Sequence, residues 1–368
     1  IKGKKPQFVI VGSHMDAWGA AVSCNATGNA STIETARVFS EFRSELRRGV
    51  EFLWFTGHET GIMDGSTWYV DNFWDNLHKN CVAYFNNDSV GMIYQTIYAG
   101  GGDPVFDEFL RSTIRDLAEE EGVPFTTATA RMRYMPSKTG DQSFLGLGIP
   151  SGRARTTYTR EAAEKGITGL GWWYHSDKDT LDKADAEALY MANKAQVLAV
   201  LRLCILPVLP YKVTPLVDWM IDTLKEHNDK AKGTWSITDL LEKANAFRKI
   251  TVRLDEALNG LSERCKDEAK VQMLEEKIRA ANEGLLKICR ILSPVNYTLH
   301  GKYGQDYYGA EYVRPMPLLL PVAELATLNS DTSHYKALRT KLVKARNVVS
   351  DALEEAMWFA EYTIEKAS

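Results

Sequence analysis

Five side chains of the types that bind metal ions stand beside segments with strand or helix patterns, namely His14, Asp16, Glu59, Asp88 and His175. A hydrolytic metal centre needs histidine and carboxylate ligands and one position that stays open for water. Each side chain also has an ordinary structural explanation: Asp88 as a helix cap, His175 as a packed core residue, Glu59 as a loop carboxylate. Taken together, the five predict a metal-hydrolase centre.

His14 and Asp16 are separated by one residue at the end of an apolar segment. In an extended chain, residues two apart point the same way, so the Asp16 carboxylate is expected to accept a hydrogen bond from the His14 imidazole. Such a carboxylate–histidine pair holds the imidazole in place for a metal ion. A His-x-Asp pair alone would fit a surface turn equally well.

The elements that must position these residues alternate between strands and helices. The apolar patterns of residues 7–12, 50–55 and 81–85 predict buried strands. The apolar pattern of residues 31–46 predicts a helix between the first two of these strands. This alternation predicts an α/β fold with a mostly parallel, twisted sheet flanked by helices. Functional sites in such sheets gather outside the carboxyl ends of the strands, where His14, Glu59 and Asp88 would lie.

The length of 368 residues suggests two domains, and the sequence pattern changes after Pro207 and Pro210. We predict an α/β domain over residues 1–208 and a mostly helical domain over residues 209–368. The helical patterns of the second domain are interrupted at 293–321, where proline, glycine and tyrosine predict an irregular loop.

Composition and charge argue against several functional classes. A net charge of −4 gives no electrostatic basis for binding nucleic acid or an anionic membrane. The sequence has no uninterrupted apolar run long enough to span a bilayer. Its five cysteines are scattered and form no CxxC pair, so they predict no disulfide framework and leave the compartment open. Because the chain does not start with methionine, we expect it to be the C-terminal part of a longer protein.

Several motifs resemble the co-catalytic zinc aminopeptidase and glutamate carboxypeptidase family. Residues 9–89 carry the first group, from VIVGSHMDAWG through FTGHETG to FNNDS. The resemblance continues in LGIPSGRAR (147–155), YHSDKDTLDK (174–183) and HGKYG (300–304). The last two segments and the helical tail are typical of the branch that contains the glutamate carboxypeptidases and the transferrin receptor.

The resemblance to this branch implies an assembly and a location. Residues 209–368 resemble its dimerisation domain, so a homodimer is expected. The branch also carries an upstream protease-associated domain, which we expect to be absent from this chain. An extracytoplasmic or secreted location is favoured by the same resemblance.

The resemblance also implies a role for each candidate ligand. His14 and Asp88 would bind one metal ion, and Glu59 and His175 would bind a second. Tyr174 stands where the family uses a tyrosine to steady the oxyanion, although an aromatic residue packed beside the site is an equally good explanation.

Two positions depart from the family pattern. Cys24 stands where the family bridges its metal ions with an aspartate, and His58 stands where the family has a glutamate as general base. A thiol with a pKa of about 8.5 becomes a thiolate ligand only when a metal or local charge deprotonates it, and its softness favours zinc or iron. An imidazole can act as a base but lacks the negative charge of glutamate. Alternatively, His58 could bind a metal ion itself.

Three interpretations of this remodelled site remain open, with one or two zinc ions as the expected cofactor and iron or another transition metal as alternatives. The first is an amide or peptide hydrolase in which His58 accepts a proton from water. The second is an enzyme of altered, non-peptidase chemistry that uses Cys24 as ligand or nucleophile, and the third is a non-catalytic receptor or scaffold. We favour an enzyme, because both replacements are residues that can themselves bind metal.

The substrate is expected to carry a free carboxylate. Arg153 and Arg155 are two apart in the segment SGRAR, and paired guanidinium groups suit a carboxylate, although a salt-bridged strand end would explain them equally well. The resemblance adds that glutamate carboxypeptidases carry an arginine patch in a matching segment. It also implies that the loop at 293–321 returns to the active site, where Lys302 and Tyr303 hold the terminal carboxylate of a small or peptide substrate. The alternative for these two residues is an ordinary loop rich in glycine and tyrosine.

Overall fold

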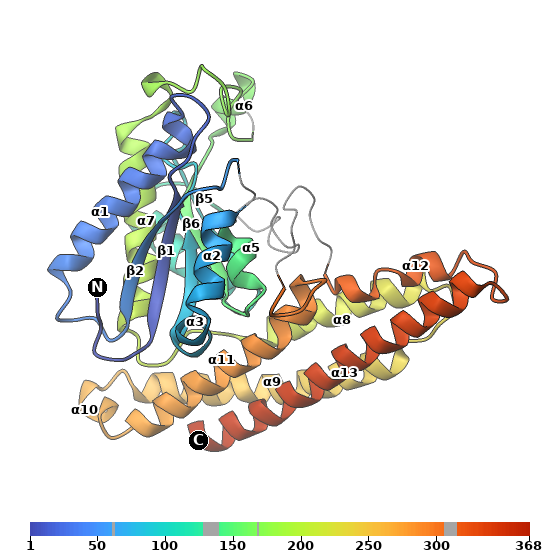
Figure 1. The fold of residues 1–368 in the computed structure, drawn as a ribbon. Helices are drawn as coiled ribbons and strands as arrows, with labels where there is room; N and C mark the ends of the chain where they lie inside the picture. Colours follow the sequence, from blue (N-terminus) through green and yellow to red (C-terminus); the bar gives the residue numbers. More distant parts are fainter. Residues whose placement is uncertain (61–62, 128–139, 168, 305–314) are drawn as a thin grey trace.

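The computed structural model describes residues 1–60, 63–127, 140–167, 169–304 and 315–368. The N-terminal part is a twisted sheet with helices on both faces, and the C-terminal part consists of long helices that lie beneath the sheet in the view of Figure 1. The predicted α/β fold with a helical C-terminal region is therefore confirmed.

The described strands form one sheet in the order β2-β1-β3-β6-β4-β5. They are β1 (Phe8–His14), β2 (Gly49–Phe55), β3 (Cys81–Asn86), β4 (Ile97–Gly102), β5 (Phe125–Thr127) and β6 (Ser151–Thr157). β4 and β6 are antiparallel, and the other neighbouring strands are parallel. His14 pairs with Phe55 and Gly12 with Asn86, so the carboxyl ends of β1, β2 and β3 lie at the same edge.

Helices cover both faces of the sheet. In chain order they and the single helical turns are η1 (Val22–Ala26), α1 (Thr27–Glu41), α2 (Asp64–Asn72), α3 (Trp74–Asn80), α4 (Asp107–Glu121), α5 (Gly140–Leu145), α6 (Arg160–Glu164), η3 (Leu181–Lys183) and α7 (Ala186–Ile205). Alternate residues of β1 point to opposite faces. Val9 and Val11 share a core cluster with residues of α1 and α7, whereas Phe8 and Ile10 share another with residues of α2, α3 and α5.

Among the described residues, α7 is the one helix long and apolar enough to cross a membrane, judged by length and composition alone. Half of its most apolar window is buried inside the protein, where Ala195, Ala199 and Leu203 belong to the core cluster. Packing in the core therefore accounts for the buried half of this window.

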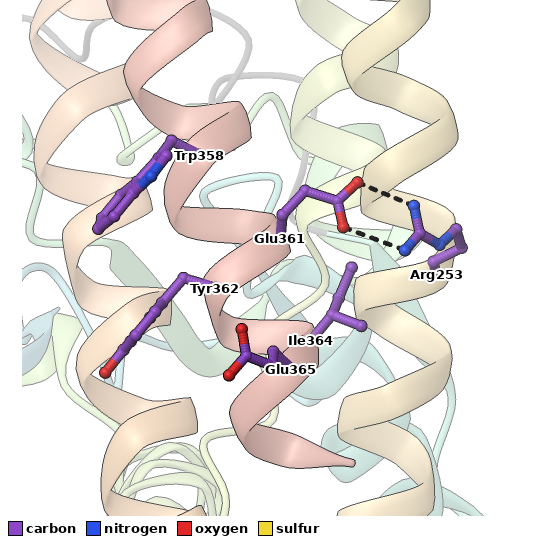
Figure 2. A pocket seen from close by; sticks show the side chains of 6 residues that line it. All are labelled: Arg253, Trp358, Glu361, Tyr362, Ile364 and Glu365. Carbon is purple, nitrogen blue, oxygen red and sulfur yellow. Dashed lines mark hydrogen bonds and ion pairs between the residues drawn. The ribbon is translucent and has the colours of Figure 1, made fainter.

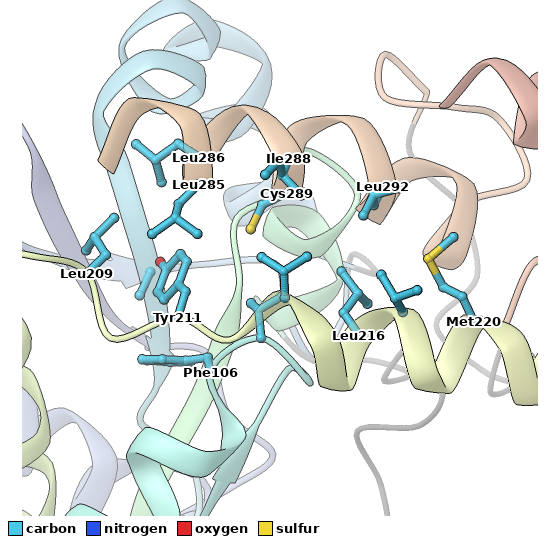
Figure 3. Packing of buried hydrophobic residues seen from close by; sticks show 14 of the residues in the cluster. Phe106, Leu209, Tyr211, Leu216, Met220, Leu285, Leu286, Ile288, Cys289 and Leu292 are labelled. Carbon is cyan, nitrogen blue, oxygen red and sulfur yellow. The ribbon is translucent and has the colours of Figure 1, made fainter. Parts of the chain in front are cut away.

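The C-terminal part consists of α8 (Val213–Lys230), α9 (Thr238–Arg264), α10 (Glu268–Val271), α11 (Glu275–Tyr297), η4 (Pro317–Leu319), α12 (Val322–Leu325) and α13 (Ser333–Ala367). Leu216 of α8 and Leu292 of α11 lie in one buried cluster with Tyr211 and with Phe106 beside the sheet (Figure 3). Apolar packing thus joins the helical part to the sheet in one continuous core.

The irregular segment predicted at 293–321 begins later than expected, because α11 continues to Tyr297. Pro294 lies inside this helix, and every residue from Ser293 to Tyr297 is buried. Burial of this last turn outweighs the hydrogen bond that a proline cannot donate. Residues 305–314 of the predicted loop lie outside the described residues.

The surface of the helical part carries an aromatic pair beside a charged one. Trp358 and Tyr362 of α13 are exposed, and their rings are stacked with centroids 5.7 Å apart. Nearby, Arg253 of α9 donates two hydrogen bonds, of 2.8 and 3.0 Å, to Glu361 (Figure 2). The homodimer expected from residues 209–368 stays a prediction.

Arg290 of α11 is buried between the helical part and the sheet. Its guanidinium donates hydrogen bonds to the main-chain carbonyls of Leu77, His78, Cys81 and Gly148. These carbonyls belong to the end of α3, the start of β3 and the turn before β6. One side chain of the helical part therefore fixes the segments that lead into two strands.

Asp103 follows β4 and is 1% exposed. Its carboxylate accepts hydrogen bonds from the Val105 N–H at 3.1 Å and from the Tyr297 hydroxyl of α11 at 3.0 Å. Burial raises the pKa of Asp103 from 3.8 to about 6, against the lowering effect of the two hydrogen bonds, and the charge of Asp107 adds to the rise.

The unsubstituted chain is expected to become less stable as the pH rises from about 4 to about 7. The Asp103→Asn variant is expected not to show this decrease. Because the pKa is raised from 3.8 to about 6 on folding, the unfolded chain ionises first, and the folded chain then has to bury a charge. This shift corresponds to about 3 kcal/mol of unfolding free energy. Urea unfolding at several pH values measures the effect, and identical pH profiles of the two proteins would contradict it.

Candidate metal centre

The carboxyl ends of β1, β2 and β3 bring three of the predicted ligands together. His14 is the last residue of β1, Glu59 follows β2 by four residues and Asp88 follows β3 by two. The Nε2 atom of His14 lies 3.4 Å from Asp88 Oδ1 and 3.9 Å from Glu59 Oε1. The predicted edge of the sheet is therefore where these side chains meet.

His175 reaches the same place from the segment before η3. Its Nε2 atom is 2.9 Å from Glu59 Oε1, and its ring is stacked on that of Tyr174 with centroids 3.8 Å apart. The backbone of His175 is left-handed, with a φ of 58°. A non-glycine residue in this region is strained, and such strain is typical of functional sites.

The thiol of Cys24 lies at the centre of the cluster. Cys24 lies in the segment η1, at a point where the backbone departs from helical geometry with a φ of −139° and a ψ of 79°, and it is 1% exposed. Its Sγ atom is 3.6 Å from His14 Nε2, 3.3 Å from Glu59 Oε1, 3.4 Å from the Tyr174 hydroxyl and 3.7 Å from His175 Nε2. The sulfur thus lies within reach of groups from both predicted ligand pairs. Burial raises the pKa of Cys24 far above its usual range, and the charge of Asp88 adds to the rise.

Asp179 holds the Cys24 segment and is a residue that sequence reasoning missed. Its buried carboxylate accepts hydrogen bonds from the Ser23 N–H at 2.9 Å, the Ser23 hydroxyl at 2.8 Å and the Cys24 N–H at 3.2 Å. Trp173 also donates to the Ser23 hydroxyl at 3.2 Å. The sequence could have pointed to Asp179, because this residue lies in the same motif as His175, YHSDKDTLDK (174–183).

Asn25 ties the end of β1 to the end of β3. Its amide Nδ2 donates to the Ser13 hydroxyl at 2.9 Å and to the Asn87 carbonyl at 3.1 Å, and its Oδ1 accepts from the Ser89 N–H at 3.2 Å. Gly28 makes this approach possible, because a Cβ atom there would lie 2.2 Å from Asn25 Oδ1.

Asp16 acts on His14 through a different group than the sequence predicted. The main-chain carbonyl of Asp16 is 2.9 Å from His14 Nδ1, whereas its carboxylate Oδ1 is 3.8 Å away. The other carboxylate oxygen accepts the Glu59 N–H at 2.6 Å. The prediction from two-residue alternation was wrong because β1 ends at His14, so Asp16 is no longer in extended chain. Asp16 thereby contacts residues from both ligand pairs.

His58 packs directly on His14. Their rings are stacked, with centroids 4.2 Å apart and planes 14° from parallel. Burial lowers the pKa of His58, although the charge of Asp88 works against this. Burial alone would also lower the pKa of His14, but the hydrogen bond and charge of Asp88 outweigh it, so the pKa of His14 is raised. The two imidazoles therefore differ in their tendency to carry a proton.

The residues present fit a zinc ion. Two groups have ligand atoms that all lie within 4.8 Å of one another: His14, Cys24 and Glu59, and His14, His58 and Asp88. In addition, Asp16 Oδ1 is buried and has no hydrogen-bond partner among the described residues. Imidazole nitrogens, a sulfur and carboxylate oxygens together form a donor set that suits zinc.

The predicted substrate residues lie in two places. Arg153 and Arg155 alternate along β6 with buried Ala154, and the charge of Arg153 helps to lower the pKa of Asp88. By contrast, the Tyr303 ring lies 5.0 Å from the ring of Trp74 in α3, and Lys302 Nζ lies 5.0 Å from the Tyr303 ring. The charge of Arg153 thus acts on the metal centre, whereas Tyr303 packs on α3, and binding of a carboxylate by these residues stays a prediction.

A metal-binding cluster at the carboxyl ends of parallel strands defines a metallohydrolase-like centre on an α/β sheet. Residues 1–200 match the sequence model of peptidase family M28, and the chain belongs to this family. The predicted family is therefore confirmed.

Among curated relatives, leucine aminopeptidase 2 of Arthroderma otae is 27% identical over 213 residues, which cover 52% of this chain and 41% of the relative. The probable glutamate carboxypeptidase VP8 of Zea mays is 28% identical over 126 residues, 33% of this chain and 17% of the relative. The chain spans about two fifths of the length of the leucine aminopeptidase it matches. Among solved structures, a zinc aminopeptidase from Bacillus subtilis is similar with a TM-score of 0.44 and 22% identity, covering 54% of this chain and 47% of that one.

Proposed function

We propose that this chain is part of a zinc-dependent hydrolase that cleaves an amide or peptide bond in a small substrate with a free carboxylate. Membership of a peptidase family and a donor set that suits zinc support the reaction class. The observation that carries the proposal is the position of Cys24, whose Sγ atom lies 3.3 to 3.7 Å from Glu59, Tyr174, His14 and His175. A decayed centre would not be expected to keep a metal-binding atom there.

The side chains of the centre fall into metal ligands and a proton acceptor. His14 and Asp88 would hold one ion, and Glu59 and His175 a second, with Cys24 between them. Zinc, when bound, acts as a Lewis acid that polarises the carbonyl group to be cleaved and activates the attacking water. The imidazole of His58 offers a nitrogen that can accept a proton during attack.

Tyr174 is the group proposed to stabilise developing negative charge. Its hydroxyl oxygen lies 3.4 Å from Cys24 Sγ, at the ligand cluster, and its hydrogen can be turned toward a substrate oxygen there. A donor aimed at the oxygen that gains charge is among the strongest single contributions to catalysis of acyl transfer.

Arg153 supports the proposed preference for a carboxylate. Its charge acts on Asp88, and it lies half-buried on the same side of β6 as Arg155. A guanidinium close to the ligand cluster can bind a carboxylate with two parallel hydrogen bonds. The substrate's charged end would then lie close to the bond that is cleaved.

We expect the purified protein to contain stoichiometric zinc by elemental analysis. It is also expected to hydrolyse a peptide with a free C-terminal carboxylate about 10- to 100-fold faster than the same peptide amidated at its C-terminus. Equal rates for the pair would contradict the substrate class only. A zinc-free protein would contradict the whole proposal, and a zinc-loaded protein that cleaves neither peptide would favour a receptor or scaffold.

A further inference from the structure

Trp18 lies in the segment that follows β1 and touches the metal centre from outside. Its side chain is 49% exposed, yet its indole Nε1–H donates a hydrogen bond of 2.9 Å to Glu59 Oε2. The carboxylate that it contacts belongs to a side chain only 7% exposed. The indole therefore donates a hydrogen bond to a carboxylate that is almost inaccessible to solvent, and covers it.

The two oxygens of Glu59 have different surroundings. Oε1 faces the ligand cluster, at 2.9 Å from His175 Nε2 and 3.3 Å from Cys24 Sγ. Oε2 is the acceptor for Trp18. Because an indole N–H can only donate, this contact occupies Oε2 and leaves Oε1 as the oxygen that faces the cluster.

The main chain of Glu59 is held by the same short segment. The Glu59 N–H donates to Asp16 Oδ2 at 2.6 Å, and the Met15 N–H donates to the Phe55 carbonyl at 2.6 Å, which continues the pairing of β1 with β2. Residues 15–18 thus fix both the backbone and the side chain of Glu59. The ring of Trp18 also lies near that of His175, with centroids 6.5 Å apart.

We propose that Trp18 is a positioning residue that orients Glu59 so that Oε1 alone is presented to a metal ion. The proposal rests on the proposed function only in requiring that the centre binds zinc. Removing a residue that hydrogen-bonds to a metal ligand, without binding the metal itself, typically weakens metal affinity by about 10- to 100-fold. Trp18 is a donor to the carboxylate and is not itself a ligand.

The test replaces the indole by a ring without a donor. Trp18→Phe is expected to raise the dissociation constant for zinc by about 10- to 100-fold, measured by competition with a chromophoric chelator. It is also expected to change the visible absorption spectrum of the cobalt-substituted protein, because Glu59 can then turn its second oxygen toward the ion. The unfolding midpoint of the metal-free protein should stay unchanged, since the ring is half-exposed.

Trp172→Phe is the matched control. Trp172 is 64% exposed, and its ring packs on Trp173 and beneath Lys183 rather than on a candidate ligand. This variant should keep the zinc affinity and the cobalt spectrum of the unsubstituted chain. Unchanged affinity and spectrum in Trp18→Phe would overturn the proposal, as would a loss of metal-free stability large enough to explain the affinity. Failure of the unsubstituted chain to bind zinc would instead refute the proposed function.

Discussion

Replacing Cys24 by aspartate and His58 by glutamate in the same chain is expected to raise kcat/KM for peptide hydrolysis by about 100-fold or more. Cys24 Sγ lies between His14 and His175, at 3.6 and 3.7 Å, so a carboxylate at this position could contact both predicted ions. Aspartate is charged at neutral pH, whereas burial raises the pKa of the Cys24 thiol. A glutamate at position 58 would add a negatively charged base next to Glu59.

The single variants separate the two contributions. Cys24→Asp tests the bridge, His58→Glu tests the base, and Cys24→Ser is a control that removes the sulfur without adding charge. Each protein is compared at equal zinc content, with kcat and KM measured on one peptide substrate. If the double variant folds, binds zinc and gains nothing, then this centre is not a remodelled peptidase. The interpretation of Cys24 as part of a different chemistry would then be favoured.

Replacing Arg290 by leucine is expected to lower the free energy of unfolding by about 3 kcal/mol or more. The guanidinium satisfies main-chain carbonyls at the end of α3, the start of β3 and the turn before β6. A leucine cannot donate to them, and buried carbonyls left without a donor cost about 1–3 kcal/mol each. Urea unfolding followed by circular dichroism measures the loss.

Arg279→Leu on the same helix is the matched control. Arg279 is 63% exposed in its side chain and pairs with Glu283 one turn along α11 at 3.5 Å. An exposed pair of this kind contributes about 0.5 kcal/mol or less. If Arg290→Leu were no more destabilising than Arg279→Leu, then the buried guanidinium would not hold the helical part to the sheet.

The sheet edge at which His14, Glu59 and Asp88 meet was predictable because each strand can be assigned from its own local pattern. Each of β1, β2 and β3 is a short apolar run, and parallel strands place their carboxyl ends at one edge. His14, Glu59 and Asp88 follow these runs, so their meeting at one edge needed only the strand assignment. The family comparison then pointed to Cys24 and His58 as the positions of interest.

What could not be predicted depends on turns and on contacts between distant segments. The carbonyl rather than the carboxylate of Asp16 meets His14, because the strand ends at His14, two residues before Asp16. Trp18 contacts Glu59, and Asp179 contacts Ser23, across separations of 41 and 156 residues, so the motifs that contain them do not say which residues they hold. The extent of α11 is decided by burial of its last turn.

The hydrogen bonds of Asn25 restrict how this protein can be produced. The tripeptide Asn25–Ala26–Thr27 is an acceptor sequence for N-linked glycosylation, which replaces one hydrogen on Nδ2. Asn25 uses that nitrogen to reach the Ser13 hydroxyl and the Asn87 carbonyl, and its side chain is buried. A chain that received a glycan there before folding could not join β1 to β3 at the metal centre. We therefore expect folded protein with an intact site to carry no glycan at Asn25, which mass spectrometry of the purified chain would show.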